Sequence, residues 1–583
     1  MSNCKASCSV LLVLFIVGLC SVCQYSAAQV DANQTANLII NASISRPIPE
    51  TLFGIFFEEI NHAGAGGIWA ELVSNRGFEA GGQNTPSNIA PWSIIARAVI
   101  FVPAGGVGIY NPGFWGMNIE QGKVYKVVLF VRSLGSINVS VSLTSSDGSK
   151  MLATANILDS DVSNWTKVEV LLEATGTNPN SRLQLTTSRK GVIWFDQVSA
   201  MPVDTYKGHG FRNELIEMLD DIKPQFIRFP GGCFIEGEWL RNAFRWKESI
   251  GPWEERPGHF GDVWMYWTDD GLGYFEFLQL AEDLGSRPIW VFNNGISHQD
   301  QVDTTAVLPF VQEALDGLEF ARGDSNSKWG SKNYRGNYLK FYNAIRSAYP
   351  DIKIISNCDG SSRSLDHPAD YYDFHIYTSA SNLFSMTHQF DRTSRTGPKV
   401  CNSDIVEMAS YAPLFVNVND RRWNPDAIVF NSSKHYGTPS YWVQKLFRES
   451  SGANLLDSKL QTNSSTLVAS AITWQNSDGK TYLKIKIVNF GNSKVNLKVS
   501  IDGLGLSSQL SESTKTVLTS SNLMDENSFS NPKKVVPAQT LVENADKDMD
   551  LVLTPYSVTS FDLLTESNSI RMPQTDSFSR SSI

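Results

Sequence analysis

Polar side chains follow several short apolar runs of this chain, and their types suit the binding of a carbohydrate. The run "TLFGIFFEEI" ends in the carboxylates Glu58 and Glu59, and "PQFIRFPGG" leads directly into Cys233. Similar positions hold Arg228, Asn293, Asn294, Asn357, Asp359, His375 and Tyr377. Groups that hydrogen-bond hydroxyls, interleaved with aromatic rings, are what a sugar pocket needs. As a set, these residues predict such a pocket, although each one alone is also an ordinary turn or cap residue.

Other kinds of active site lack their motifs in this sequence. It contains no G-x-S-x-G, no G-x-x-x-x-G-K-[ST], no H-E-x-x-H and no G-x-G-x-x-G after a predicted strand. The histidines are scattered without the spacing of metal ligands, so we expect no metal site and no cofactor. The formal net charge of -10 argues against a nucleic-acid partner, because such proteins usually present a basic face.

Alternating strands and helices are expected to position these residues. Strand-like apolar runs occupy residues 51–60, 224–232, 287–295, 352–360 and 371–379. Helical periodicity lies between the runs, as in the face made by Phe211, Leu215, Met218, Leu219 and Ile222. This alternation predicts a (β/α)8 TIM-type barrel, in which functional groups gather at the C-terminal ends of the strands.

Two places break the alternation. The stretch "ARGDSNSKWGSKNYRG" lies where the fourth strand is expected, but it is almost entirely polar. Further along, "GPKVCNSDIVEMASYAPLF" passes from a shortened seventh strand into the next strand without room for a helix. We therefore expect a barrel that is interrupted at strands 4 and 7.

Two further regions have the sequence pattern of all-β structure. Residues 92–203 contain short runs of alternating apolar and polar residues separated by turns, which predicts a β-sandwich module. Residues 455–565 show the same texture and predict a C-terminal β-sandwich, and the polar tail 566–583 is expected to be disordered.

The N-terminal residues 1–28 have the pattern of a secretory signal peptide, with Lys5, a short apolar run and small residues before the expected cleavage. A signal anchor is the alternative. Secretion agrees with candidate N-glycosylation sites at Asn33, Asn41, Asn138, Asn164, Asn431 and Asn463. Three cysteines remain after cleavage, Cys233, Cys358 and Cys401, and their wide spacing is not that of a disulfide framework.

Several stretches resemble the plant α-L-arabinofuranosidases of glycoside hydrolase family 51. They are "ISRPIPETLFGIFFEEINHAGAGGIWAELVSNRGFE", "IRFPGGCFIEGE", "NNGISHQDQ", "YYDFHIYTSASN" and "MASYAPLFVNVNDRRWNPDAIVFN". The resemblance implies a first barrel strand within 29–91, a catalytic-type barrel at 204–454, and a carbohydrate-binding-like module at 92–203. That module is shortened near "PWSIIARAVIFVPAGGVG". The implied activity is release of terminal α-L-arabinofuranosyl groups from cell-wall arabinan and arabinoxylan, with retention of configuration.

The resemblance also implies which residues act on the sugar. The family's acid/base glutamate follows strand four in Gly-Asn-Glu, and its nucleophile ends strand seven in a Ser-Glu-Tyr-like motif. This sequence has no Gly-Asn-Glu, and it reads "WGSKN" and "GPKVCNSD" at the two places, so we expect neither catalytic glutamate. Glu58, Asn293 and Tyr377 match residues that line the sugar subsite. Cys233 stands where bacterial relatives carry Asn.

Three hypotheses follow. The first is a secreted arabinofuranosidase by family, located in the extracellular matrix or cell wall, with little or no activity. The second is a non-catalytic arabinan-binding protein with no membrane association after signal cleavage. The third is a non-productive splice form or a mis-joined gene model. Either one would explain the abrupt junctions in an otherwise close match.

Overall fold

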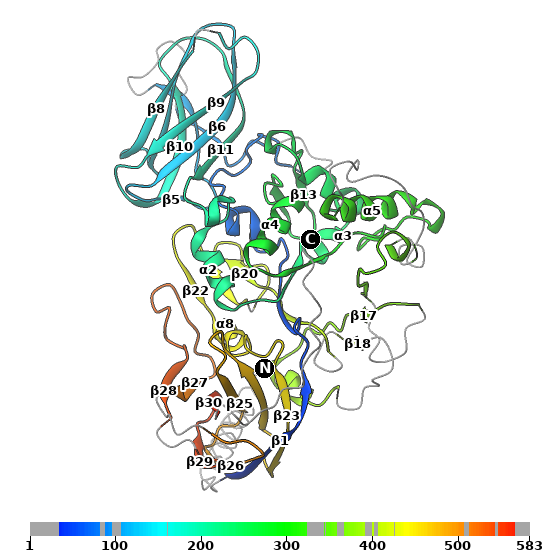
Figure 1. The fold of residues 1–583 in the computed structure, drawn as a ribbon. Helices are drawn as coiled ribbons and strands as arrows, with labels where there is room; N and C mark the ends of the chain where they lie inside the picture. The colour runs from blue at the N-terminus through cyan, green and yellow to red at the C-terminus, as the bar shows by residue number, and fades with distance from the viewer. Residues whose placement is uncertain are drawn as a thin grey trace, which may run out of the picture. The chain divides into compact units, whose positions relative to one another are not determined.

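The structure is a computed structural model, and it divides into two compact units (Figure 1). It describes residues 34–81, 88–95, 106–159, 161–322, 343, 345–357, 367–390, 399–400, 406–424, 426–506, 512–542 and 546–565. One unit combines the N-terminal residues up to Arg46 with Leu455–Asp525 and the residues from Pro537 onward. The other contains Pro47–Asn454 and Glu526–Val536. The predicted N-terminal segment 29–91 is thus shared between the units.

Two sheets of the larger unit consist entirely of parallel strands. The first has the order β15-β12-β2-β19, with β2 (Phe53–Phe56), β12 (Phe226–Phe229), β15 (Arg287–Trp290) and β19 (Ala409–Tyr411). The second pairs β16 (Ile355–Ser356), β17 (Tyr371–Tyr372) and β18 (Lys399–Val400). Residues 323–342 and 401–405, on which the expected interruptions fall, lie outside the described residues.

Helices and short connecting elements complete this region. The α-helices are α2 (Asn213–Asp221), α3 (Cys233–Glu236), α4 (Tyr274–Asp283), α5 (Leu308–Arg322), α7 (Ala380–Ser385) and α8 (Pro439–Lys445). Short turns of helix are η1 (Gly64–Ile68), η2 (Tyr206–Gly208), η3 (Leu240–Asn242), η4 (Trp246–Ser249), η5 (Trp253–Glu255) and η6 (Thr304–Ala306). Small sheets consist of β13 (His259–Gly261) with β14 (Tyr266–Thr268), and of β20 (Phe415–Asn417), β21 (Ile428–Phe430) and β22 (His435–Gly437).

The core of this region explains why these elements form. Ile55 and Phe57 of the first strand run lie fully buried against Ile227 and Phe229 of β12. The helical face predicted around α2 is confirmed, because Leu215 and the other large apolar residues of that face pack into the same core. Burial of one apolar stripe per helix is the main source of such stability.

Residues 93–202 form two antiparallel sheets over a single apolar core. One sheet has the order β3-β4-β10-β7-β8 with β5 beside β10, and the other has the order β11-β6-β9 (Figure 1). Alternate side chains such as Val127, Leu129 and Val141 are fully buried between the sheets, as period-2 patterning requires. The strands are β3 (Ser93–Ile94), β4 (Val107–Asn111), β5 (Met117–Ile119), β6 (Val124–Ser133), β7 (Ile137–Ser145), β8 (Met151–Asp159), β9 (Thr166–Glu173), β10 (Asn178–Thr187) and β11 (Ile193–Pro202).

The smaller unit is built on a sheet with the strand order β28-β27-β30-β25-β24-β23-β1-β26-β29. Its interior strand β1 (Gln34–Pro47) comes from the start of the described chain and runs parallel to β26, with Leu38 opposite Val499. The other strands are β23 (Asn454–Thr462), β24 (Leu467–Gln475), β25 (Thr481–Asn489), β26 (Val495–Asp502), β27 (Thr514–Thr519), β28 (Ala538–Leu541), β29 (Asp548–Leu553) and β30 (Ser557–Leu564). The sheet thus gains a strand that the sequence pattern of residues 455–565 does not reveal.

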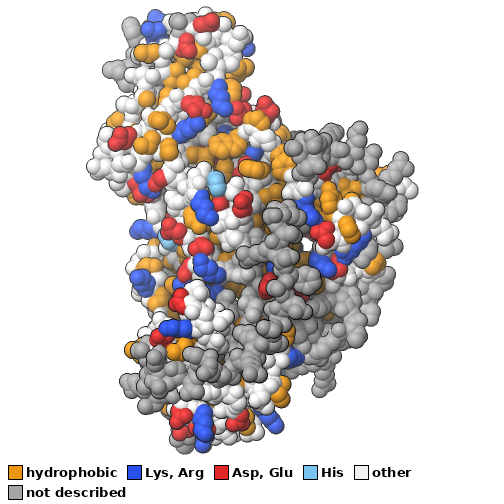
Figure 2. Space-filling view, viewed as in Figure 1, with side chains coloured by type: hydrophobic (Ala, Val, Ile, Leu, Met, Phe, Trp, Pro, Cys, Tyr) orange, Lys and Arg blue, Asp and Glu red, His pale blue; other side chains and the backbone are white. Residues whose placement is uncertain are grey.

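Charged side chains are spread over the surface. Figure 2 shows acidic and basic side chains interspersed over the described part of one face. Among the described residues, the structure has no helix with the length and apolar character needed to cross a membrane.

Candidate functional site

Glu58 follows β2 and is held in place by two donors. Its Oε1 atom accepts hydrogen bonds from the Phe234 backbone N–H (3.0 Å) and from the Trp264 indole N–H (3.1 Å). Gly231 approaches so closely that a Cβ built there would lie 2.6 Å from the Glu58 Cγ atom, at a φ of +150°. Burial raises the pKa of Glu58, while the Phe234 and Trp264 donors and the charge of Arg228 oppose that shift. The carboxyl group is therefore oriented by its surroundings.

Glu59 points into the protein and has a structural role. Its carboxylate accepts hydrogen bonds from the Gly64 and Ala65 backbone N–H groups (both 3.2 Å) and from the Tyr266 hydroxyl (2.8 Å). Burial raises the pKa of Glu59 to about 7. Successive side chains of an extended chain face opposite sides, so only one of the two adjacent glutamates is available to a ligand.

Tyr377 and His375 lie close enough to Glu58 for its negative charge to raise their pKa values. Burial raises the pKa of Tyr377, and the negative charge of Glu58 adds to that effect. The pKa of His375 is raised first by its hydrogen bond to Asp373 (Nδ1 to Oδ2, 2.9 Å) and also by Glu58. The Tyr377 ring is 68% exposed and meets the Trp423 ring edge-on at 5.1 Å between centroids. We call Glu58, Trp264, His375, Tyr377 and Trp423 the Glu58 cluster.

Asn293 binds backbone groups. Its Nδ2 atom donates to the carbonyl oxygens of Ile235 (3.0 Å) and Ile296 (3.1 Å), and its Oδ1 atom accepts from the Gly295 N–H (2.6 Å). The side chain therefore ties the loop after β15 to helix α3. A direct contact between Asn293 and a sugar stays a prediction.

Cys233 begins helix α3 and is half-buried. Burial, reinforced by the negative charges of Glu58 and Glu236, raises the pKa of its thiol to about 12. A thiol in such surroundings is a poor nucleophile, because the thiolate is the reactive form. Cys358 and Cys401 lie outside the described residues.

The other predicted residues divide between exposed, half-buried and undescribed positions. Asn294 and Asn357 are exposed, and Asp359 lies outside the described residues. Among the candidate glycosylation sites, Asn164 and Asn463 are exposed. Asn41, Asn138 and Asn431 are half-buried, and Asn33 is not described.

The sequence pattern did not predict Trp264 and Trp423 as residues of the site. Trp264 lies in the turn between β13 and β14, and Trp423 lies in a loop before β21. Neither follows a strand of the parallel sheets, so the search at strand ends misses them. For Trp264 the available signal was the density of aromatic residues in "GDVWMYW", whereas Trp423 is a single aromatic residue in "NDRRWNP" and gives no such signal.

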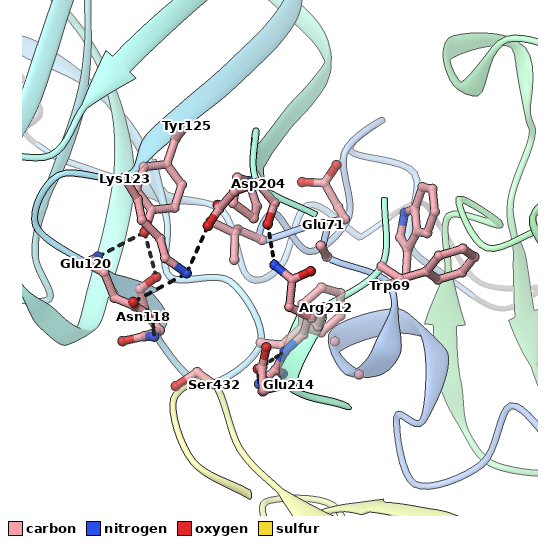
Figure 3. A pocket seen from close by; sticks show the side chains of 18 of the residues that line it. Trp69, Glu71, Asn118, Glu120, Lys123, Tyr125, Asp204, Arg212, Glu214 and Ser432 are labelled. Carbon is pink, nitrogen blue, oxygen red and sulfur yellow. Dashed lines mark hydrogen bonds and ion pairs between the residues drawn. The ribbon is translucent and has the colours of Figure 1, made fainter. Parts of the chain in front are cut away.

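A separate hollow of about 80 Å3 lies beside strands β5 and β6, and Figure 3 shows its lining. Lys123 reaches between Glu120 (3.3 Å) and Asp204 (3.4 Å). Arg212 pairs with Glu214 at 2.6 Å. Because these cations are already paired with carboxylates, they are poor binding groups for an anionic ligand.

Comparison with known proteins gives consistent matches over almost the whole chain. A family model described as "Alpha-L-arabinofuranosidase 1 domain" matches residues 218–335 and 330–395, and "Alpha-L-arabinofuranosidase C-terminal domain" matches residues 400–557. The chain is 61% identical to Alpha-L-arabinofuranosidase 1 of Arabidopsis thaliana and 59% identical to Alpha-L-arabinofuranosidase 2 of that plant, with 98% of each protein covered. A solved structure of the arabinose-bound α-L-arabinofuranosidase MgGH51 superposes with a TM-score of 0.81 at 27% identity, covering 91% of this chain and all of that one.

The alignment with Alpha-L-arabinofuranosidase 1 is longer than this chain. It extends over 662 positions, whereas this chain has 583 residues. The Arabidopsis relative therefore contains segments without a counterpart in this chain.

Proposed function

Because this chain belongs to the α-L-arabinofuranosidases of glycoside hydrolase family 51, we propose that it is a secreted member whose catalytic step is impaired. By analogy with the names of its relatives, its ligands are terminal α-L-arabinofuranosyl groups. We propose cell-wall arabinan and arabinoxylan as the polysaccharides that carry these groups. Secretion to the extracellular matrix or cell wall is supported by the signal-peptide pattern of residues 1–28 and by the candidate glycosylation sites.

The absence of the two catalytic glutamates from the sequence carries this proposal. A retaining glycosidase needs two carboxyl groups about 5–5.5 Å apart, one as acid/base and one as nucleophile. No Gly-Asn-Glu occurs in the chain, and the residues after Lys399 and Val400 read "CNSD" where the family has its nucleophile. Acid–base help is worth about 10²–10⁴-fold, and loss of the nucleophile also removes the covalent route.

Interruption of the barrel at strands 4 and 7 is the physical basis that we propose for this loss. The described parallel strands of the larger unit fall into separate sheets: one of four strands, one of three strands, and the sheet that contains the parallel pair β20–β21. Between β18 and β19 lie only residues 401–408, whereas a crossover between parallel neighbours needs about a dozen residues or more. The greater length of the Arabidopsis relative supports the same interpretation, including a shortened carbohydrate-binding-like module at 92–203.

The carboxyl groups near Glu58 are poor substitutes for the missing pair. Glu59 is enclosed by its own donors, and Asp373 is engaged by His375. Glu58 has a raised pKa that suits a general acid, but among the described residues Glu59 and Asp373 are already held by other partners and are poor candidates for the nucleophile's role. A displacement of even about 1 Å in a reacting group can cost on the order of 100-fold in rate.

Hydrolysis of an aryl α-L-arabinofuranoside by the purified chain tests the proposal. The Arabidopsis relative serves as the positive control, and circular dichroism establishes that both proteins are folded. We expect a folded chain with a rate near the uncatalysed background. Turnover at a rate comparable to that of the relative would mean that other carboxyl groups perform the reaction.

Arabinan binding without turnover is the second candidate function, and the Glu58 cluster favours it. Aromatic rings and an oriented carboxyl group are the features that hold a sugar ring. Isothermal titration with linear arabinan distinguishes this candidate from a non-productive splice form, because the latter would not accumulate as a folded, secreted protein.

A further inference from the structure

Three side chains with metal-binding atoms converge beside helix α3. Cys233 and Glu236 are three residues apart on this helix, and that spacing places them on the same side. His298 comes from the loop after β15. The Cys233 sulfur, a Glu236 carboxylate oxygen and a His298 ring nitrogen all lie within 4.8 Å of one another. The sequence does not reveal this cluster, because one member comes from a different loop.

Backbone hydrogen bonds fix the His298 loop against the end of α3. The His298 N–H donates to the Gly237 carbonyl (3.1 Å), and the Gln299 N–H donates to the Glu238 carbonyl (3.0 Å). Asn293 adds its own bond to the Ile235 carbonyl. The imidazole is therefore presented to α3 by an ordered segment.

The Nδ1 atom of His298 already has a carboxylate partner, Glu238, of the kind that a metal-bound histidine requires. Nδ1 lies 3.1 Å from Glu238 Oε2, and the other oxygen of that carboxylate accepts a hydrogen bond of 2.7 Å from the Gln299 amide. Metal-binding histidines almost always donate their second ring N–H to such a group, which fixes the tautomer. This arrangement leaves Nε2 facing Glu236 Oε2, at 3.1 Å.

We propose that Cys233, Glu236 and His298 form a binding site for a divalent transition-metal ion, with Zn2+ as the ion that best matches one sulfur, one nitrogen and one oxygen ligand. Zinc–ligand bonds of about 2.0–2.3 Å require donor atoms roughly 3.4 Å apart in a tetrahedron. The cluster reaches this spacing by small rotations, because the Glu236 and His298 side chains are 40% and 33% exposed. The fourth position stays open to water. The site goes beyond the proposed function and does not depend on arabinose.

The charges around the cluster favour a cation. The carboxyl groups of Glu58 and Glu236 lie near the Cys233 thiol, and their negative charge favours a bound cation. Metal binding at a protonated thiol releases that proton, so affinity rises with pH.

Titration of the purified full chain with Co2+ and Zn2+ tests the site. We expect one equivalent of Co2+ to produce a thiolate-to-metal charge-transfer band in the near ultraviolet. Titration calorimetry with Zn2+ in buffers of different ionisation enthalpy should show the release of about one proton. The band should disappear in Cys233→Ser, and His298→Gln should weaken Zn2+ binding by more than about 10-fold. Glu238→Gln should keep the band but weaken binding by about 10- to 100-fold, because it acts through His298.

His209→Gln is the matched control, since His209 is also paired with a carboxylate, Asp283, at 2.9 Å. Circular dichroism of each variant establishes that it is folded. The proposal is wrong if wild-type chain gives no thiolate band, or if the band survives in Cys233→Ser and is lost when Cys358 or Cys401 is replaced. It is also wrong if His209→Gln and His298→Gln weaken binding equally.

Discussion

The indole N–H of Trp264 donates a 3.1 Å hydrogen bond to Oε1 of Glu58. This bond joins the turn between β13 and β14 to the end of strand β2, two elements far apart in the sequence. The same oxygen accepts from the Phe234 N–H at the start of α3. The orientation of Glu58 therefore depends on the start of α3 and on the turn between β13 and β14.

Glu58→Gln should weaken arabinan binding by about 10- to 100-fold, since a hydrogen bond to a charged group contributes about 1.5–3 kcal/mol. The amide oxygen can still accept from Trp264 and Phe234, so the fold should be kept. Titration calorimetry with arabinan measures the effect. Glu50→Gln, which removes a charge from an exposed pair with Arg287, is the control. Equal affinities of wild type and Glu58→Gln would exclude Glu58 from the binding site.

Glu59 should make the larger unit less stable as the pH rises from about 4.5 to about 7. Its pKa is raised from 4.5 to about 7, so the folded state holds a proton that the unfolded state loses in this window. The contribution is fully present below pH 4.5 and is lost as the pH passes 7. Its size is on the order of 3 kcal/mol. Asp426, whose pKa burial raises to about 8, acts in the same direction.

Thermal unfolding of wild type and Glu59→Gln between pH 4.5 and pH 8 measures this effect. The variant should lose less stability than wild type over that range. Parallel curves for the two proteins would contradict the assignment.

Glu276→Ala should destabilise the larger unit by about 3–5 kcal/mol, because it leaves the buried guanidinium of Arg256 without its partner. The pair is bidentate, with Arg256 Nη2 at 2.8 Å and Nη1 at 3.1 Å from the two carboxylate oxygens. Both side chains are less than 10% exposed. Urea unfolding measures the loss. Glu50→Ala should cause little change, since surface pairs contribute little. Similar costs for both variants would refute this prediction.

Strand positions were predictable from the sequence, whereas side-chain directions and distant pairings were not. The apolar run before Glu58 and Glu59 identified β2, and "PQFIRFPGG" identified β12, because buried parallel strands are continuous apolar runs. Which of the two glutamates faces the ligand depends on Gly64, Ala65 and Tyr266, which no local pattern connects to them. His298 meets Glu236 only because the loop after β15 folds back onto α3.

Restoring the two segments that we propose to be missing should restore catalysis, and only when both are present. We expect that inserting the Arabidopsis relative's segment between Trp329 and Asn333, or its segment after Val400, leaves activity near background. Each single insertion supplies one of the two carboxyl groups, whereas the retaining mechanism needs both the acid/base and the nucleophile. The double insertion should raise the rate on an aryl arabinofuranoside by at least about 10⁴-fold. Activity in either single insertion would show that the chain already supplies the other group.

The position of strand β1 in the sequence also limits when the C-terminal sheet can form during synthesis. It emerges from the ribosome before any of its sheet partners, and its parallel neighbour β26 is made more than four hundred residues later. Until then, the apolar side chains of β1, such as Leu38 and Ile40, have no sheet to join. A fragment that starts at Leu455 lacks this interior strand and exposes the facing edges of β23 and β26. The C-terminal sheet therefore joins a strand from the start of the described chain to strands that are synthesised about four hundred residues later or more.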